Sequence, residues 1–359
     1  MSITSEIQRR RTRTVRVGSV LLGSDHPVAV QSMTNTKTQD VDTTLAQIAA
    51  LASAGCEIVR LAVPDTEAVA AFGKIRGETD LPLVADIHFD YKLAIGALEA
   101  GADKVRINPG NIGSEDRVKA VLDAASAHGA AVRIGVNAGS LEKDLIDLHG
   151  GVTAQALVDS ALRHVAFAEK AGFTDLVLSI KASDVPMMVA ATVALSAAVD
   201  YPLHLGVTEA GTPGTGTIRS AVGLGALLSR GIGDTLRVSL TGDPVEEVKA
   251  AWPMLAALNL RQRGVTLISC PTCGRTHGAM AQMATAVEAA LAGIDRPLTV
   301  AVMGCEVNGP GEAREADLGV ALGKGTALLF KKGKPIGKIA QEEVVDTLVD
   351  LVKHWEGLS

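Results

Sequence analysis

The stretch LPLVADIHFDYKLAIGALEAGADKVRINPGN (residues 81–111) contains two apolar, strand-like runs, Pro82–Phe89 and Lys104–Asn108, separated by an alanine-rich amphipathic run. A strand, a helix and a second strand in this order form the βαβ unit of a parallel sheet. Aromatic residues are few, so the core must be built from Ala, Val, Leu and Ile, which suits helices packed on such a sheet. The stretch therefore predicts an α/β fold.

The same unit recurs through residues 1–262 of the 359-residue chain. The strand candidates are Pro27–Thr34, Cys56–Val63, Pro82–Phe89, Lys104–Asn108, Ala131–Asn137, Leu176–Lys181, Pro202–Thr208 and Thr235–Thr241. Eight strand–helix units of this size match a (β/α)8 TIM barrel, which typically needs about 250 residues. The wider gap after the fifth strand holds GSLEKDLIDLHGG (residues 139–151), which we interpret as an insertion in a βα loop. We predict a closed barrel over residues 1–262, with an open doubly wound sheet as the alternative.

Residues 263–359 have a different character. They contain three of the four cysteines, a helical run at Ala279–Ala292, several strand-like runs and a terminal helical run at Glu342–His354. The sequence KKGKP (residues 331–335), which lies between two apolar runs, predicts a hairpin turn. We predict a smaller α+β domain that follows the barrel without a long linker.

The composition excludes several classes of protein. The net charge is −6, and the only aromatic residues are five Phe, two Tyr and two Trp, which argues against a nucleic-acid-binding protein. The longest apolar stretch, Met187–Val199, is well short of the roughly 20 residues that a membrane-spanning helix needs. The basic N-terminal stretch has no apolar run behind it, so we interpret it as a solvated arm and not an export signal. Four cysteines in so long a chain do not make a disulfide framework, and we expect a cytoplasmic protein.

Polar side chains recur toward the C-terminal ends of the predicted strands, mostly at alternate positions that share a face. They are Asp86 and His88, Arg106 and Asn108, Arg133 and Asn137, Arg237 and Ser239, together with Arg60, Lys181 and, after the seventh strand, Glu209. Each alone is explained by a surface ion pair or a buried hydrogen bond, but TIM-barrel active sites lie at this end of the strands. Five cations in one barrel mouth would repel one another unless an anion lay among them. The pattern therefore predicts a site for a phosphorylated small molecule, whose oxygens arginine binds in pairs.

The loop after the seventh strand, TEAGTPGTGTIRSAVG (residues 208–223), supports this interpretation. Gly211, Gly214 and Gly216 allow a ligand to approach the backbone closely, and a helix with free N–H groups is predicted to begin just beyond. The loop is not a GxGxxG motif, because Arg219 takes the sixth position. The loop supports a phosphate site because of its position after the seventh strand, where TIM barrels often bind phosphate.

The cysteines of the second domain have the spacing of metal ligands. Cys270 and Cys273 form C-x2-C, and Cys305 follows in GCEVNGPGEA, whereas we assign Cys56, at the start of a barrel strand, to the core. A metal centre with four protein ligands would need one more ligand besides these three cysteines. His277 would complete a zinc site, and Glu306 or Glu312 would complete an iron–sulfur cluster with one exchangeable carboxylate ligand; the spacing leaves both open.

The motifs ADIHF, VRINPGNIG, RIGVNAGSL, SIKAS, HLGVTEAG, DTLRVSL, CPTCGRT and GCEVNGPGEA together give the chain its resemblance to a known family. It resembles the 4-hydroxy-3-methylbut-2-enyl diphosphate synthases of the methylerythritol phosphate route to isoprenoids, over nearly its whole length. The length and the direct passage from barrel to cysteine domain are similar to the two-domain bacterial form.

The resemblance implies an oxidoreductase with a [4Fe–4S] cluster held by Cys270, Cys273, Cys305 and Glu312, which decides against zinc and His277. It implies 2-C-methyl-D-erythritol 2,4-cyclodiphosphate as the substrate, bound through its diphosphate at the barrel mouth. It also implies a homodimer, in which the cluster domain of one subunit closes over the barrel of the other, and flavodoxin or ferredoxin as the electron donor.

As a mechanistic hypothesis, Glu209 delivers a proton to the departing hydroxyl, with His88 and Asp86 assisting, while Asn308 orients the substrate. Glu312 would give way to a substrate oxygen. Two other functions remain as alternatives. One is a zinc-dependent barrel lyase or hydrolase acting on a phosphorylated molecule, and the other is a non-enzymatic iron–sulfur carrier or redox sensor.

Overall fold

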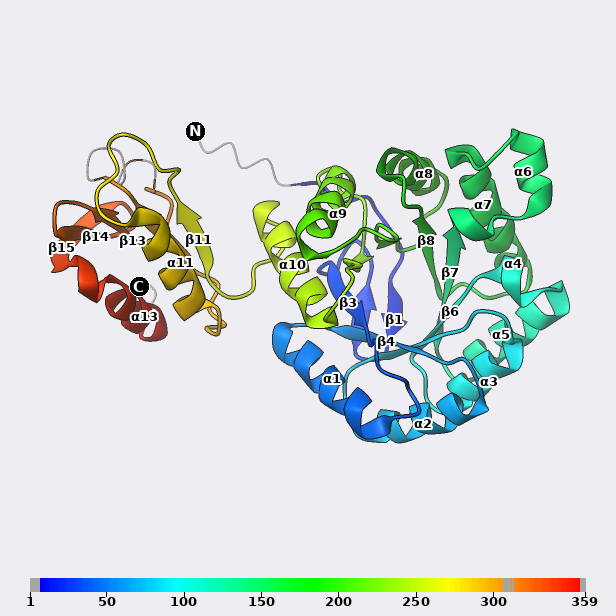
Figure 1. Cartoon of the computed structure of the whole chain (residues 1–359). Helices are drawn as coiled ribbons and strands as arrows, with labels where there is room; N and C mark the ends of the chain where they lie inside the picture. The colour runs from blue at the N-terminus through cyan, green and yellow to red at the C-terminus, as the bar shows by residue number, and fades with distance from the viewer. Residues whose placement is uncertain (1–6, 306–310, 312, 356–359) are drawn as a thin grey trace. The chain divides into compact units, whose positions relative to one another are not determined.

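The computed structural model describes residues 7–305, 311 and 313–355. The chain divides into two compact units, Met1–Arg261 and Gln262–Ser359 (Figure 1). Each unit has its own hydrophobic core, built almost entirely from aliphatic side chains.

The first unit contains an eight-stranded parallel sheet that closes into a barrel. Its strands are β3 (Ala29–Met33), β4 (Ile58–Ala62), β5 (Leu83–Asp86), β6 (Lys104–Ile107), β7 (Ala131–Asn137), β8 (Leu176–Lys181), β9 (His204–Leu205) and β10 (Thr235–Leu236). They pair in the order β8-β7-β6-β5-β4-β3-β10-β9, and a parallel bridge between Leu178 and Leu203 joins the two ends of the sheet. The predicted TIM barrel is confirmed, and each predicted strand contains one of these strands.

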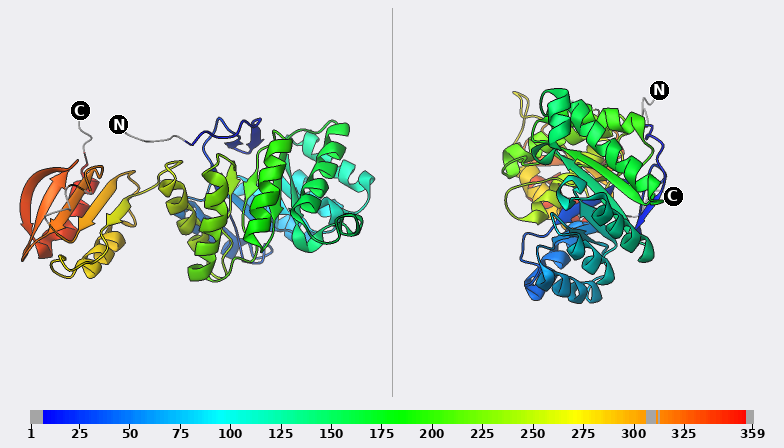
Figure 2. Two further views of the ribbon diagram at one scale, coloured as in Figure 1. Left: turned by 90° about the horizontal axis from the view of Figure 1, so that it is seen from above. Right: turned by 90° about the vertical axis from the view of Figure 1, so that its right-hand side faces the viewer.

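Helices surround the barrel on its outside (Figures 1 and 2). They are α1 (Val41–Ala54), α2 (Thr66–Gly77), α3 (Tyr91–Glu99), α4 (Pro109–Ile112), α5 (Glu115–Ala127), α6 (Lys143–His149), α7 (Ala154–Lys170), α8 (Val185–Ala198), α9 (Pro213–Leu228) and α10 (Pro244–Ala257). Several begin after an aspartate whose carboxylate accepts a backbone N–H of the first turn, as Asp65 does from Ala68. The insertion at residues 139–151 forms α6.

A hairpin closes the N-terminal end of the barrel. Its strands, β1 (Val15–Val17) and β2 (Val20–Leu22), are antiparallel. Their buried side chains pack on the first inward-facing residues of five barrel strands, which are Ala29, Ile58, Val84, Ala131 and Val177. The interior therefore has an apolar floor beneath its polar upper part.

The segment before this hairpin is bound to the barrel. Arg9 forms an ion pair of 2.6 Å with the buried Asp234, and Arg10 donates to the backbone oxygens of Ser196 and Tyr201 at 3.0 and 2.6 Å. The expectation of a solvated arm is wrong for these two arginines. They hold the chain across the floor of the barrel, a role that a run of arginines in a sequence does not reveal.

In its described residues, the second unit contains a five-stranded sheet and the helices α11 (Met280–Leu291) and α13 (Val344–Lys353). Its strands pair in sequence order: β11 (Thr266–Ser269), β12 (Thr299–Met303), β13 (Leu318–Leu322), β14 (Thr326–Lys331) and β15 (Lys334–Ala340). The first three are parallel, and the last two are antiparallel to their neighbours. The helices α11 and α13 pack on the sheet through one apolar cluster. The predicted KKGKP turn joins β14 to β15, with positive φ angles at Lys332 and Gly333.

Candidate active site

Alternation along the barrel strands sends the predicted cations into the barrel interior. On β4, Val59 and Leu61 belong to the core shared with the outer helices, so Arg60 between them points inward. The same alternation places all five cations named from the sequence inside the barrel: Arg60, Arg106, Arg133, Lys181 and Arg237. The first four are buried, and the Arg237 side chain is 16% exposed.

Asp86, at the end of β5, is the carboxylate among these cations. Its Oδ1 lies 3.4 Å from Arg106 Nη1, and its Oδ2 lies 3.2 Å from Nε2 of the exposed His88. Burial alone would raise the pKa of Asp86, but the charge of Arg60, the hydrogen bond from His88 and the charge of Arg106 hold it well below its ordinary value. Asp86 is therefore ionised, and the predicted Asp86–His88 pair is formed.

Glu247 of α10 is a second carboxylate at the mouth. Its Oε1 and Oε2 accept from Nη2 and Nε of Arg237 at 2.9 and 3.0 Å, which is the bidentate geometry of arginine with a carboxylate. The same carboxylate accepts from the Ser32 hydroxyl at 2.9 Å and from the Leu240 amide at 3.0 Å. These contacts fix Arg237 in orientation.

The hydrogen-bond partner of Arg60 within the described residues is weak and neutral. Its Nε and Nη2 lie 3.0 and 2.9 Å from the sulfur of Met33, and a thioether is a poor acceptor. Burial lowers the pKa of Arg60 to about 10, against the attraction of Asp86. The guanidinium remains charged at neutral pH and keeps most of its donors available.

Two glycines make room for the cations. A Cβ atom at Gly135 would lie 2.8 Å from Arg106 Nε, and one at Gly206 would lie 2.7 Å from Lys181 Nζ. Both distances are shorter than real Cβ contacts. Any larger residue at these positions would therefore displace a charged group of the interior.

Positive charge exceeds negative charge in the described part of the interior. Arg133 is 1% exposed, and its Nε and Nη1 have no hydrogen-bond partner among the described residues. Buried arginines normally pair with acceptors, since an unpaired buried charge is costly. Asp86 and Glu247 are shared among five cations, so the interior suits an anion with several oxygens.

Further predicted residues lie around the mouth. Asn108 donates from Nδ2 to the Ser140 hydroxyl at 2.6 Å, and that hydroxyl lies 3.5 Å from the backbone oxygen of Asn137. Asn137 is the β-partner of Lys181 on β8. Ser239, two residues beyond Arg237, is half-buried.

Glu209 follows β9 and is exposed. Its φ of 51° places it in the left-handed region, which non-glycine residues rarely adopt. Such strained positions cluster at functional sites. In the loop that follows, Gly211 has a φ of 121° and approaches Gly216 closely, whereas Gly214 and Gly216 lie in the first turn of α9.

Some residues of the interior were not found from the sequence. Lys104 opens β6 and is fully buried, with Nζ 3.4 Å from Gln31 Oε1. It lies two residues before Arg106, so the alternation that identified Arg106 and Asn108 also predicts that Lys104 points into the barrel interior. Glu247 gave no such signal, because its role depends on how α10 packs against the strand ends.

The predicted cysteine ligands of the second unit lie at the C-terminal ends of neighbouring strands. Cys270 follows β11 and Cys305 follows β12; both are half-buried, and Cys273 is exposed. The backbone N–H of Gly304 donates to Cys270 Sγ at 3.1 Å, which brings the two loops together. A hydrogen bond from the Arg275 backbone lowers the pKa of the Cys273 thiol. Cys56, in contrast, is in the barrel core, where burial raises its pKa to about 12.

These thiols suit a cluster by their chemistry. Amide hydrogen bonds to sulfur favour the thiolate form that binds iron. Within residues 7–305, 311 and 313–355, no three His, Cys, Asp or Glu side chains are placed to share a single metal ion; in a [4Fe–4S] cluster each thiolate binds a different iron. Asn308, Glu312 and the alternative ligand Glu306 lie outside the described residues.

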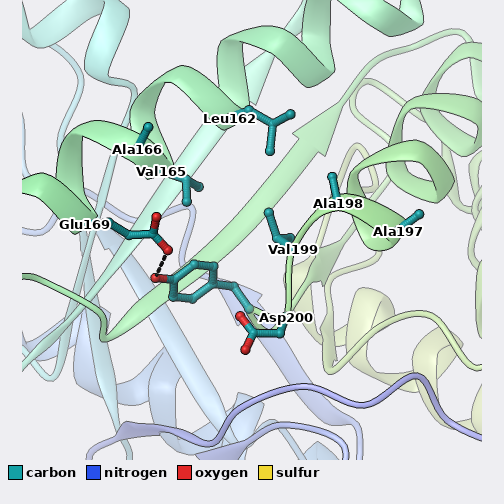
Figure 3. Close-up of a pocket in the computed structure, with 9 residues that line it drawn as sticks. Leu162, Val165, Ala166, Glu169, Ala197, Ala198, Val199 and Asp200 are labelled. Atoms are coloured by element: carbon teal, nitrogen blue, oxygen red, sulfur yellow. Dashed lines mark hydrogen bonds between the residues drawn. The ribbon is translucent and has the colours of Figure 1, made fainter.

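A groove of about 650 Å³ lies on the outside of the barrel, between α7 and the end of α8 (Figure 3). Its charged lining residues are Glu169, which accepts from the Tyr201 hydroxyl at 2.9 Å, and Asp200. The lining residues include no Lys or Arg, and Arg13 beside the groove is paired with Asp200 at 2.6 Å, so the groove lacks the excess of positive charge found in the barrel interior. Among the described helices, none is both long and apolar enough to cross a membrane.

The fold and the site define a class of protein: a TIM barrel with a cationic interior, followed by a smaller domain that presents three cysteines. Residues 12–252 match the family model described as the GcpE TIM-barrel domain, and residues 266–354 match the GcpE protein C-terminal domain. The chain belongs to the GcpE family, and the resemblance seen in the sequence is confirmed.

Curated relatives agree with this assignment. A protein of Clostridium tetani is 54% identical over 97% of this chain and 100% of its own length, and one of Geobacter sulfurreducens is 57% identical over 95% and 97%. Both are named 4-hydroxy-3-methylbut-2-en-1-yl diphosphate synthase (flavodoxin). Among solved structures, the dihydropteroate synthase of Stenotrophomonas maltophilia is similar with a TM-score of 0.51 and 17% identity, over 69% of this chain and 97% of that one. This likeness concerns the barrel fold alone.

Proposed function

We propose that this chain converts 2-C-methyl-D-erythritol 2,4-cyclodiphosphate to 4-hydroxy-3-methylbut-2-enyl diphosphate. The reaction opens the cyclic diphosphate and takes up two electrons and two protons, and one hydroxyl leaves as water. Family membership supports this reaction, and the curated relatives carry the name of its product. Zinc-dependent hydrolysis and a purely electron-carrying role are the less favoured alternatives.

The observation that carries the proposal is the unbalanced positive charge of the barrel interior. Five cations surround the buried carboxylates of Asp86 and Glu247, the latter paired with Arg237, and Arg133 has donors without partners among the described residues. A diphosphate supplies several acceptor oxygens and the missing negative charge. Arg60, Arg106, Arg133, Lys181 and Arg237 would bind it, with Asn108, Asn137 and Ser239 at the rim.

The same cations assist the chemistry. As the ring opens, negative charge concentrates on the diphosphate, and preorganised guanidinium groups stabilise that charge without rearranging. Glu209 is our choice for proton delivery to the departing hydroxyl, because its strained backbone position lies at the loop after β9. The Asp86–His88 pair would assist, and Asn308 would orient the substrate.

Cys270, Cys273, Cys305 and Glu312 would hold a [4Fe–4S] cluster. When bound, the cluster supplies low-potential electrons and a Lewis-acidic iron, which no side chain provides. The carboxylate of Glu312 binds iron more weakly than a thiolate, so it is the ligand suited to leave. We also propose flavodoxin or ferredoxin as the donor, a homodimer with cluster and barrel contributed by different subunits, and a cytoplasmic location.

Anaerobically purified holoenzyme tests the reaction directly. With reduced flavodoxin and the cyclodiphosphate, we expect formation of 4-hydroxy-3-methylbut-2-enyl diphosphate, measured by mass spectrometry, and a brown protein with iron and sulfide on analysis. Arg106→Met should weaken substrate binding by roughly 1.5–3 kcal/mol, the range for a charged hydrogen bond. Lys119→Met, which removes an exposed cation paired with Asp123 on α5, is the matched control.

Three results would contradict the proposal. A colourless protein containing zinc would favour the hydrolase alternative. A brown protein that passes electrons but leaves the cyclodiphosphate intact would favour the carrier. Equal substrate affinity in the Arg106 and Lys119 variants would remove Arg106 from the binding site.

A further inference from the structure

A layer of buried polar residues lies one step below the predicted site. Lys104 is level with Val84 and Ala131 of the neighbouring strands, whereas Arg106 is level with Asp86 and Arg133. His204 and Thr235 are level with Ala29, which belongs to the apolar floor. Lys104, His204 and Thr235 therefore lie deeper than the residues proposed to bind diphosphate.

The side chains of this deep layer form almost no hydrogen bonds within the described residues. Lys104 is fully buried, and among the described residues the hydrogen-bond partner of its Nζ is Gln31 Oε1, at the long distance of 3.4 Å. Gln31 Nε2, both ring nitrogens of His204 and the Thr235 hydroxyl have no partner among the described residues. Unpartnered buried polar groups are rare in proteins and call for an explanation.

The groups around Lys104 are mainly cationic. Those that face the interior are Arg60 (β4), Asp86 (β5), Arg106 (β6), Arg133 (β7), Lys181 (β8), His204 (β9) and Arg237, which follows β10, with its partner Glu247 (α10). Asp103 lies immediately before β6. Burial, and then the charges of Arg133 and Arg60, lower the pKa of Lys104 well below its ordinary value. Burial and neighbouring cations act on Lys181 and His204 in the same direction.

Only some of these groups can relieve the excess charge by losing a proton. Guanidinium groups stay protonated in proteins, so the arginines remain charged. Lysine releases its proton readily when it is buried among cations. His204 begins from a lower ordinary pKa than lysine, and burial lowers its pKa further, so the neutral imidazole is favoured.

We propose that Lys104 is neutral in the empty barrel and takes up a proton when a diphosphate-bearing anion enters the mouth above it. Lys104 Nζ accepts the proton from solvent, and the new ammonium offsets negative charge that the mouth residues leave unneutralised. It acts through Arg106 and Arg133, which lie one step above it and are proposed to bind the diphosphate, and is thus a positioning residue. This inference rests on the proposed function, and it extends that site inward by one layer.

Calorimetry can count the protons. Inorganic pyrophosphate is titrated into the holoenzyme at pH 7.5 in two buffers of different ionisation enthalpy, and the difference in heat gives the protons taken up. Because pyrophosphate titrates itself, the wild type is compared with variants. We expect Lys104→Met and Lys104→Arg both to take up fewer protons than the wild type, since methionine has no charge to gain and arginine keeps its charge throughout.

The pH dependence of pyrophosphate affinity distinguishes protonation of Lys104 from a role in packing alone. Each proton taken up makes affinity fall by up to tenfold per pH unit as the pH rises, and we expect this slope to be shallower in both Lys104 variants. The exposed Lys119→Met variant should keep the wild-type proton count and slope. Wild-type proton uptake and slope can be measured even if a Lys104 variant fails to fold.

Several outcomes would overturn the inference. Two results would show that Lys104 does not titrate on binding. In one, pyrophosphate binds to the wild type with no more proton uptake than pyrophosphate itself accounts for. In the other, the Lys104 variants take up as many protons as the wild type. The diphosphate site itself would stand in both cases. No pyrophosphate binding to wild-type protein would instead reject that site, and the inference with it.

Discussion

Glu247 binds Arg237 through both carboxylate oxygens, at 2.9 and 3.0 Å, with the carboxylate 2% exposed. Replacing it in Glu247→Gln removes the charge that balances Arg237 at the barrel mouth. We expect the free energy of unfolding to fall by about 3 kcal/mol, as for other broken buried pairs, in urea titrations near neutral pH. Asp123→Asn breaks an exposed pair with Lys119 and should cost about 1 kcal/mol or less. Equal losses in the two variants would show that the Arg237–Glu247 pair is no stronger than a surface pair.

Gly135 leaves the space that Arg106 occupies. In Gly135→Ala the new methyl group would lie 2.8 Å from Arg106 Nε, so the guanidinium must move away from its place beside Asp86. We expect KM for the cyclodiphosphate to rise about tenfold, the effect of losing one charge-assisted hydrogen bond, in anaerobic steady-state assays. The control is Gly225→Ala in α9, where nothing lies within 4 Å of the new Cβ. A KM equal to that of the control would contradict the expectation.

Arg9 neutralises a buried carboxylate at the barrel floor. Asp234 is 2% exposed and pairs with Arg9 at 2.6 Å, while burial raises its pKa. Arg9→Met leaves Asp234 with only neutral donors, so we expect a loss of roughly 2–3 kcal/mol in unfolding free energy, measured by chemical denaturation. Arg163→Met, which removes an exposed pair with Asp144, should change stability little. Similar values for the two variants would mean that the N-terminal segment contributes nothing through this pair.

Glu142 ties the inserted helix α6 to α7. It accepts from the Ser160 hydroxyl at 2.7 Å and lies 2.6 Å from His164 Nε2. Burial would raise the pKa of Glu142, but these hydrogen bonds outweigh it and lower the pKa to about 2, from an ordinary 4.5. A lowered pKa stabilises the folded state above the ordinary pKa, and this stabilisation is lost as the pH falls toward 2.

Stability measured against pH tests the role of Glu142. After allowance for solvent screening, we expect Glu142→Gln to be less stable than wild type by about 1–2 kcal/mol at pH 6, and the difference to shrink at pH 3. Asp144→Asn, at an exposed carboxylate of the same helix, is the control. A difference that does not depend on pH would assign the effect of Glu142 to packing.

The barrel was predictable because its signal is local. Each strand is a short apolar run followed by an amphipathic run, and closure follows from having eight such units. The shortest strands, β9 and β10, were predicted too long, since Gly206 and the residues after Leu236 leave regular pairing as they approach the site. The hairpin β1–β2 was missed because its first strand lies in the basic N-terminal stretch that we interpreted as a solvated arm.

The candidate site was predictable in part. Alternation along a strand identified Arg106, Arg133 and Lys181, because the strand itself decides which way they point. Glu247 and Ser140 come from α10 and from the turn before α6, so their approach to Arg237 and Asn108 depends on packing between elements. The pattern of residues within one segment cannot predict contacts between side chains of different elements.

The hairpin β1–β2 closes the N-terminal end of the barrel, so the interior is open only toward the C-terminal ends of the described strands. In the described residues, valine and leucine side chains of the hairpin cover the end of the barrel opposite the mouth. We therefore expect the product to leave through the same end of the barrel by which the substrate enters, so product that has not yet left blocks the entry of the next substrate.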